Sequence, residues 1–177
     1  MITYKHVAFA LLDTGLLTPD RVRAVLDRSA DHLDEHLDPH AVALALEDFG
    51  VAVSVPVDDV GDLKGAYADL LAQAAALTGG AVTVSDVVLH EGEFPSDGVR
   101  DDVLEFAVNG RTVTVDAEHR SDRHVDHLAA TDAVDALAPG DSRAFHYVDS
   151  GGPGTVLVLA TPEQARTLED HLGLKLH

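Results

Sequence analysis

The sequence predicts an α+β fold, in which an N-terminal helical segment packs on a mostly antiparallel sheet of about five strands. Apolar residues recur at helical spacing through residues 1–80, and the spacing changes to the alternation of strands in residues 81–177. Helices segregated from strands in this way are typical of α+β proteins. We therefore expect residues 1–177 to form one domain, with a mainly helical part and then a sheet-bearing part ordered β-β-β-α-β-β-α.

Local signals mark four helices and one strand in the first part. Residues 5–13 form a short apolar run that ends at Gly15, and Thr18-Pro19 then gives a typical cap and first helical residue. The predicted elements are a helix over residues 5–13, a second from Pro19 to Asp38-Pro39, a third over about 40–49, a strand over 51–57 that Pro56 either places at an edge or makes irregular, and a fourth helix that is capped by Asp58 or Asp59 and ends at Gly79-Gly80.

The second part carries the clearest local signal of the chain. Leu104, Phe106 and Val108 alternate before Asn109-Gly110, a pair that accepts the positive φ values of a type I′ hairpin turn. The other predicted elements are a strand over residues 81–90 bulged near Ser85-Asp86, a helix over about 123–137 capped by Ser121 or Asp122, strands over 143–148 and 155–160, and a last helix that opens with the capping box Thr161-Pro162-Glu163-Gln164 and stops at Gly173.

Charge is the strongest compositional signal. The 177 residues include 31 acidic and 12 basic side chains, for a net charge of −19 with histidine neutral. The excess is spread along the chain, because residues 1–80 hold 13 acidic and 5 basic side chains and residues 81–177 hold 18 and 7. Such a surface repels nucleic acid and anionic membranes and attracts basic partners. Solubility, coding bias and adaptation to salt are alternative explanations of the acidity.

Other features limit the chemistry and the location. The chain has no cysteine, which excludes disulfides, thiolate catalysis and cysteine-bound zinc. The apolar run that ends at Asp13 is too short to span a bilayer and lacks the pattern of a cleaved signal. We therefore expect a cytoplasmic protein without a cofactor.

Histidines suggest a second kind of site. His119, His124 and His127 lie with Glu118 and Asp126 where the hairpin ends and the next helix starts, a place suited to a general base or a metal ion. A small metal-assisted hydrolase would combine them with His90 or His146. The alternative is that Asp122 and Asp126 complement the helix N-terminus while the histidines lie in solvent.

One short segment resembles a catalytic motif. Asp149-Ser150-Gly151-Gly152-Pro153 is similar to the nucleophile motif of trypsin-like serine proteases. Those enzymes are double β-barrels with a histidine motif earlier in the chain, and this sequence has neither feature. Because the segment lies between two predicted strands, we interpret it as a turn.

These observations favour a small acidic binding protein over an enzyme. The expected function is to neutralise a basic protein partner, in the manner of an immunity protein that blocks a polymorphic toxin. The alternatives are the histidine-using hydrolase and a structural or regulatory α+β domain; partner identity and oligomeric state stay open. The predicted partner-binding residues are Asp27, Asp31, Asp34 and Glu35 of the second helix, with Asp58, Asp59 and Asp62 before the fourth.

Overall fold

The computed structural model describes all 177 residues and confirms the α+β fold, with helices packed on antiparallel sheets. The chain divides into two compact units, unit 1 (Met1–Ser54 and Gly140–His177) and unit 2 (Val55–Pro139). Residue 80, where the sequence pattern changes from helical to alternating, lies inside unit 2. The prediction of about five strands in one sheet is wrong, because seven strands form one sheet of four and another of three.

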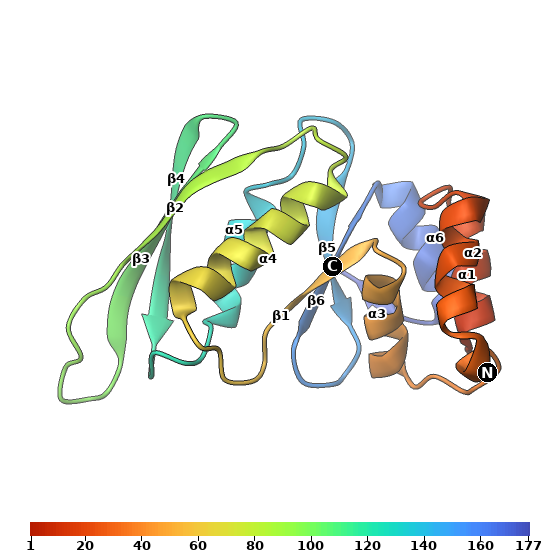
Figure 1. Cartoon of the computed structure of the whole chain (residues 1–177), viewed down its shortest axis with the longest axis horizontal. Coiled ribbons are helices and arrows are strands. Elements are labelled where there is room, and N and C mark those ends of the chain that lie inside the picture. The colour runs from red at the N-terminus through yellow and green to blue at the C-terminus, as the bar shows by residue number, and fades with distance from the viewer. The chain divides into compact units, whose positions relative to one another are not determined.

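Unit 1 combines a four-stranded sheet with four helices, which Figure 1 shows gathered on one side of the strands. The strand order is β1-β6-β5-β7, so the Pro56-flanked strand lies at an edge, as the sequence predicts. Its elements are α1 (Tyr4–Asp13), α2 (Pro19–Arg28), the 3₁₀ turn η1 (Ala30–His32), α3 (Pro39–Asp48), β1 (Ala52–Val55), β5 (Ala144–Asp149), β6 (Thr155–Ala160), α6 (Pro162–Leu172) and β7 (Lys175–Leu176).

The core of unit 1 is aliphatic. Leu11, Leu46, Val158 and Leu168 are almost fully buried and come from α1, α3, β6 and α6. Burying each such side chain contributes about 1.5–3 kcal/mol. The pattern of apolar residues in the sequence therefore identifies the helix faces that meet the sheet.

The predicted second helix is too long. The observed helix, α2, ends at Arg28, because the backbone of Ser29 leaves the helical region with φ −102° and ψ 17°. A 3₁₀ turn follows. Leu37 still packs against the core after this break. The apolar spacing thus reflects burial of a turn-rich segment rather than a continuous helix.

The turn between β5 and β6 explains the protease-like segment. Gly151 and Gly154 have positive φ values of 66° and 92°. A Cβ atom on Gly152 would lie 2.7 Å from Nδ1 of His40 in α3, so only glycine lets the turn approach that helix. The segment is a turn, as we interpreted it.

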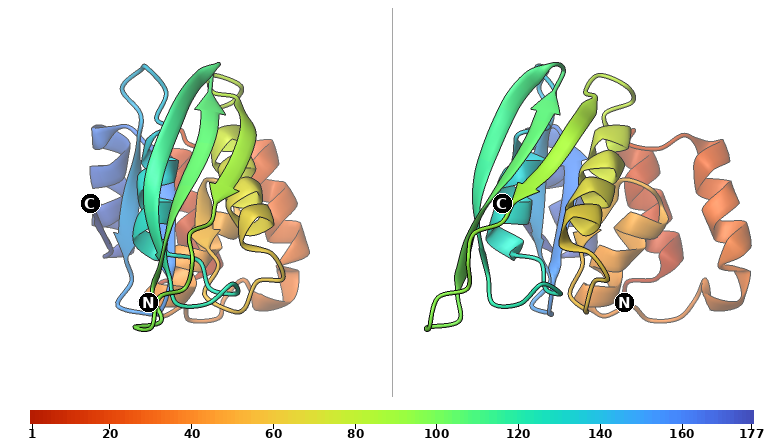
Figure 2. Two further views of the ribbon diagram at one scale, coloured as in Figure 1. Left: turned by 90° about the vertical axis from the view of Figure 1, so that its left-hand side faces the viewer. Right: turned by 60° about the vertical axis from the view of Figure 1, so that its left-hand side comes forward.

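Unit 2 is a three-stranded antiparallel sheet with two helices on one face. The order is β2-β3-β4, so β2 and β4 are the outer strands, and Figure 2 shows α4 and α5 behind the sheet. Tyr67 and Leu71 of α4, Val134 of α5, and Leu104 and Phe106 of β3 are almost fully buried and form the core of this unit. Its elements are α4 (Leu63–Leu77), β2 (Val84–His90), β3 (Arg100–Val108), β4 (Arg111–His119) and α5 (His127–Asp135).

The hairpin and the bulge of unit 2 match their sequence signals. Asn109 and Gly110 both have positive φ, at 49° and 81°, as a type I′ turn requires. The register of β2 on β3 shifts between Ser85 and Val88, and Asp86 has φ 56°. Both predictions are confirmed.

Both predicted helix caps of unit 2 are wrong by a few residues. Asp62, rather than Asp58 or Asp59, caps α4, and its carboxylate accepts a hydrogen bond from the Gly65 N–H at 2.9 Å. Asp126, rather than Ser121 or Asp122, caps α5. In each case several acidic residues precede the helix, and the one directly before the first helical residue caps it. No helix in the chain combines the length and apolar character needed to cross a membrane.

Candidate functional site

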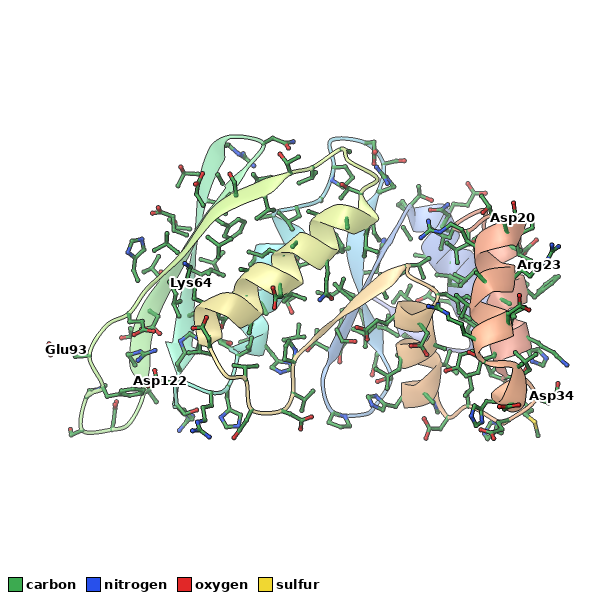
Figure 3. The ribbon with its side chains drawn as sticks, in the orientation of Figure 1. Asp20, Arg23, Asp34, Lys64, Glu93 and Asp122 are labelled. Carbon is green, nitrogen blue, oxygen red and sulfur yellow. The ribbon has the colours of Figure 1, made fainter.

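The seven acidic residues predicted to bind a partner are divided between the two units. Asp27 lies in α2, and Asp34 lies after η1, where Figure 3 labels it. Asp58 and Asp59 belong to unit 2, in the loop before α4. All seven side chains are exposed, and their action as one face stays a prediction.

Intramolecular partners distinguish these seven residues. Four of them already have a hydrogen bond or ion pair, and the carboxylates of Asp27, Asp31 and Asp58 have none. The paired ones are Asp34 with Lys5 Nζ at 2.7 Å, Glu35 with His32 Nδ1 at 2.9 Å, Asp59 with His124 Nε2 at 2.7 Å, and Asp62 with the Gly65 N–H at 2.9 Å.

The three candidate metal-binding histidines of unit 2 point to different partners. His119 is buried, His124 bonds Ser121 and Asp59, and His127 Nε2 lies 3.2 Å from the Pro56 carbonyl oxygen. No group of three or more histidine, aspartate or glutamate side chains in the chain is arranged to hold a metal ion.

The histidines proposed to complete a hydrolase site also lie elsewhere. His90 pairs with Val103, on the face of the sheet opposite to His119, and its Nε2 lies 3.5 Å from Glu105. His146 lies in unit 1, where its Nε2 is 3.2 Å from the Ala160 carbonyl oxygen. The structure does not bring these histidines together with His119.

A buried polar network fills one end of the inner face of the unit 2 sheet. The strand alternation that buries Leu104 also turns Arg100 and Asp102 toward the helices, and their register partners are His119 and Ala117. Asp102 and His119 side chains are fully buried and lie 2.6 Å apart, between Asp102 Oδ2 and His119 Nδ1.

The network extends from a guanidinium to a helix cap. Arg100 Nε donates to Asp102 Oδ1 at 2.8 Å, and its Nη1 donates to Asp122 Oδ1 at 2.7 Å. His119 Nε2 lies 2.8 Å from the Tyr67 hydroxyl, which accepts the Asp126 N–H at 2.9 Å. Figure 3 shows Asp122 in the loop after β4, at the same end of the sheet as the loop that carries Glu93.

Electrostatics keep Asp102 ionised. Burial alone would raise the pKa of Asp102, but hydrogen bonds from Arg100, the Gly92 N–H and His119 hold that pKa below its ordinary value. The hydrogen bond to Asp102 raises the pKa of Arg100, and burial raises the pKa of Tyr67. Both nitrogens of the buried His119 ring are bonded, as is typical of a histidine with a structural role, whereas Arg100 Nη2 is buried without a hydrogen bond.

An acidic cavity lies beside this network, between β4 and the first turns of α5. We call it the β4–α5 cavity, and its volume is about 340 Å³. Four carboxylates and one guanidinium line it with three apolar side chains. The lining residues are Val99, Asp116, Glu118, Arg120, Asp126, Leu128, Ala129 and Asp132.

Asp126, whose N–H bonds Tyr67 of the network, also forms part of the cavity wall. The Asp126 carboxylate accepts hydrogen bonds from the N–H groups of Leu128 and Ala129, and its other oxygen accepts the Glu118 N–H at 2.9 Å. Asp126 therefore fixes the start of α5 against the end of β4. The carboxylates of Asp116, Glu118 and Asp132 have no partner in the chain and are exposed. This arrangement suits a cationic group with an aliphatic stem.

Sequence reasoning finds only part of this cavity. The predicted cluster at the hairpin end includes Glu118 and Asp126, which the structure places together, and Asp126 acts at the helix N-terminus as the alternative interpretation expects. Asp116 and Asp132 are missed. Their signal is weak, because exposed acidic residues occur throughout this chain.

Comparison of the chain with models of protein families, with curated proteins and with solved structures finds no match.

Proposed function

We propose that this protein is an acidic binding protein that neutralises a basic protein partner. The observation that carries the proposal is the β4–α5 cavity, where Asp116, Glu118 and Asp132 are exposed and unpaired. Carboxylates left without a partner gain charge-assisted hydrogen bonds when a lysine or arginine approaches. A net charge of −19 adds long-range attraction that speeds the encounter with such a partner.

The kind of partner follows from the same charge. A toxin domain that cleaves or binds nucleic acid carries a basic surface, and an acidic protein that covers it blocks its activity. We therefore propose an immunity protein against a polymorphic toxin, acting in the cytoplasm. Asp27, Asp31 and Asp58, which are exposed and make no hydrogen bond or ion pair within the chain, would supply further contacts.

The test is capture of the partner at two salt concentrations. The tagged protein is incubated with an extract of its source organism at about 50 mM and about 500 mM salt, where the screening length falls severalfold. We expect one basic protein to be retained in stoichiometric amount at the lower salt. Its gene is then expressed in a heterologous host, where co-expression of the acidic protein should restore growth.

Three variants with equal changes of charge test whether retention of the partner depends on the cavity. The first carries Asp116→Asn, Glu118→Gln and Asp132→Asn in the cavity, and should lose most of the retained partner. The second neutralises Asp27, Asp31 and Asp58 and tests the face predicted from the sequence. The third neutralises the exposed control residues Asp20, Asp69 and Asp170. Retention of no basic protein at either salt concentration would contradict the proposal.

A further inference from the structure

β4 is an open edge of the unit 2 sheet. It pairs with β3 alone, in an uninterrupted register over all nine residues from Arg111 to His119. The other edge, β2, is interrupted by the bulge between Ser85 and Val88. Bulges protect sheet edges against added strands, and a long regular edge is a template for one. The two edges of this sheet therefore differ in their capacity to accept a strand.

The hairpin turn determines which backbone groups of β4 face the open edge. A two-residue turn makes Val108 and Arg111 a hydrogen-bonded pair, so alternate residues of β4 bond to β3. The residues between them, Thr112, Thr114 and Asp116, direct N–H and C=O groups away from β3. Glu118 has the same direction, and its N–H is taken by Asp126 Oδ2.

The side chains at this edge carry uncompensated negative charge. Glu118 lies directly opposite Asp101 of β3, with Asp116 two residues further along, and all three are exposed. None of the three side chains has a cationic partner in the chain. Like charges directly opposite each other destabilise a sheet, and a basic side chain on an added strand would relieve this repulsion.

The other face of β4 is apolar. Val113 and Val115 are half-buried on the inner face, between the open edge and the helices. An added strand would therefore meet carboxylates on one face and valines on the other. At the end of the open edge, the β4–α5 cavity provides carboxylates and the Leu128 side chain, which is 79% exposed.

From these features we infer that the partner adds an extended segment to β4, with basic residues at alternate positions and apolar residues between them. Backbone hydrogen bonds to Thr112, Thr114 and Asp116 hold the segment, as in other cases of strand addition. Ion pairs with Asp116 and Glu118 then set its register. This inference rests on the proposed function and specifies how the basic partner is bound.

The experiment uses the full chain and a synthetic peptide of eight residues that alternates lysine and valine. A second peptide has the same sequence with N-methyl groups on alternate backbone amides, which removes strand pairing and keeps the charge. Binding is measured by calorimetry at about 50 mM salt. Amide chemical shifts and hydrogen exchange then locate the peptide on the ¹⁵N-labelled protein.

We expect the unmodified peptide to bind and the N-methylated peptide to bind at least about tenfold more weakly, because most of its backbone hydrogen bonds are lost. The amides of Thr112, Thr114 and Asp116 should shift and exchange more slowly. Equal binding of both peptides would overturn strand addition while leaving the proposed function intact. Binding of neither peptide would also overturn it, and the acidic side chains would then serve only to keep the edge from self-association.

Two variants separate the backbone contribution from the charge contribution. Thr114→Pro removes an N–H that points away from β3, so the hairpin should fold and the peptide should no longer bind. Asp116→Asn should weaken binding about threefold, as expected for a cross-strand ion pair, whereas Asp20→Asn in α2 should not change it. Unchanged affinity in both β4 variants would overturn the inference. If Thr114→Pro does not fold, the test depends on Asp116→Asn, whose own spectrum verifies its fold, and on the N-methylated peptide.

Discussion

At the scale of single residues, Asp101 and Asp102 show how strand alternation separates two roles. The two carboxylates are neighbours in β3, yet Asp101 is exposed beside Glu118 and Asp102 is fully buried between Arg100 and His119. A buried charge is tolerated only with complete hydrogen bonding, and Asp102 receives it from both side chains and from the Gly92 N–H. Asp101 therefore contributes negative charge to the surface, and Asp102 stabilises the fold of the sheet from inside.

This contrast predicts that the same substitution affects stability strongly at Asp102 and weakly at Asp101. Asp102→Asn should lower the free energy of unfolding by about 3–5 kcal/mol, because Arg100 loses its main partner inside the sheet. Asp101→Asn should change it by less than about 0.5 kcal/mol, since the side chain is exposed and its loss relieves repulsion with Glu118. Urea unfolding followed by circular dichroism measures both. Equal losses in the two variants would contradict the assigned roles.

The same carboxylate predicts how stability depends on pH. The pKa of Asp102 is lowered in the folded chain, so its contribution is complete above the unfolded pKa of about 3.9 and is lost as pH falls through the folded pKa. The difference in unfolding free energy between the natural chain and Asp102→Asn should therefore shrink as pH falls below about 4. Urea titrations of both proteins between about pH 7 and about pH 3 measure this difference. A difference that is constant over the range would contradict an ionised Asp102.

Single-residue patterns in the sequence predict which residues lie on the inner face of the sheet, but not the hydrogen-bond network that they form. Extending the alternation of Leu104 and Phe106 toward the N-terminus places Asp102 and Arg100 on the inner face, so this part was predictable. The contact of Tyr67 with His119 spans 52 residues and depends on how α4 crosses the sheet. No local pattern carries that information.

At the scale of elements, two helices begin with the same Thr-Pro pair and differ in capping. Thr161 accepts the Gln164 N–H through its side chain, and Gln164 in turn accepts the Thr161 N–H, which completes a capping box. Thr18 precedes Pro19 in the same way but makes no side-chain capping bond. The reciprocal bond of the capping box depends on the residue three positions later, which is Gln164 in one helix and Arg21, a side chain without an acceptor, in the other.

Alanine substitutions should separate the two caps. Thr161→Ala should destabilise the protein by about 1 kcal/mol, whereas Thr18→Ala should destabilise it by only about 0.3 kcal/mol. Thermal and urea unfolding of the two variants measure the difference. A larger loss for Thr18→Ala would show that the capping box contributes less than its geometry implies.

Element boundaries were predictable where one signal dominates. The Asn109-Gly110 hairpin, the bulge near Asp86 and the stop at Gly173 each depend on a backbone conformation that few residues adopt. The starts of α4 and α5 were not, because each is preceded by several acidic residues that could cap it. The open edge of β4 was also beyond the sequence, since strand order depends on contacts between elements far apart in the chain.

At the scale of the whole molecule, the negative charge acts on stability as well as on binding. Acidic side chains outnumber basic ones by 31 to 12, and they are abundant in both units. Self-repulsion of this kind destabilises a folded chain and is screened by salt. Under the proposed function, the same charge would also speed the encounter with a basic partner.

The melting temperature should therefore rise with ionic strength. We expect an increase of several degrees between about 20 mM and about 500 mM sodium chloride, a range over which the screening length becomes much shorter. The variant with Asp20, Asp69 and Asp170 neutralised should start from a higher melting temperature and rise less. Differential scanning calorimetry measures both, and a melting temperature that falls with salt would contradict net repulsion.

The division of the chain into units was also outside the reach of local patterns. Unit 1 is assembled from two separate stretches, because β5, β6, β7 and α6 of the second stretch combine with β1 and the helices of the first 54 residues. A change of periodicity near residue 80 reveals where strands begin, but not which sheet each strand joins. The net charge of −19, in contrast, follows from composition alone.

The most direct test of the central claim is the affinity of the captured basic partner across a salt series. Calorimetric titrations between about 50 mM and about 500 mM salt should show affinity falling steeply with salt for the natural chain. The variant neutralised at Asp116, Glu118 and Asp132 should bind more weakly and with a shallower salt dependence. An affinity that is independent of salt, or unchanged by neutralising the β4–α5 cavity, would contradict the account.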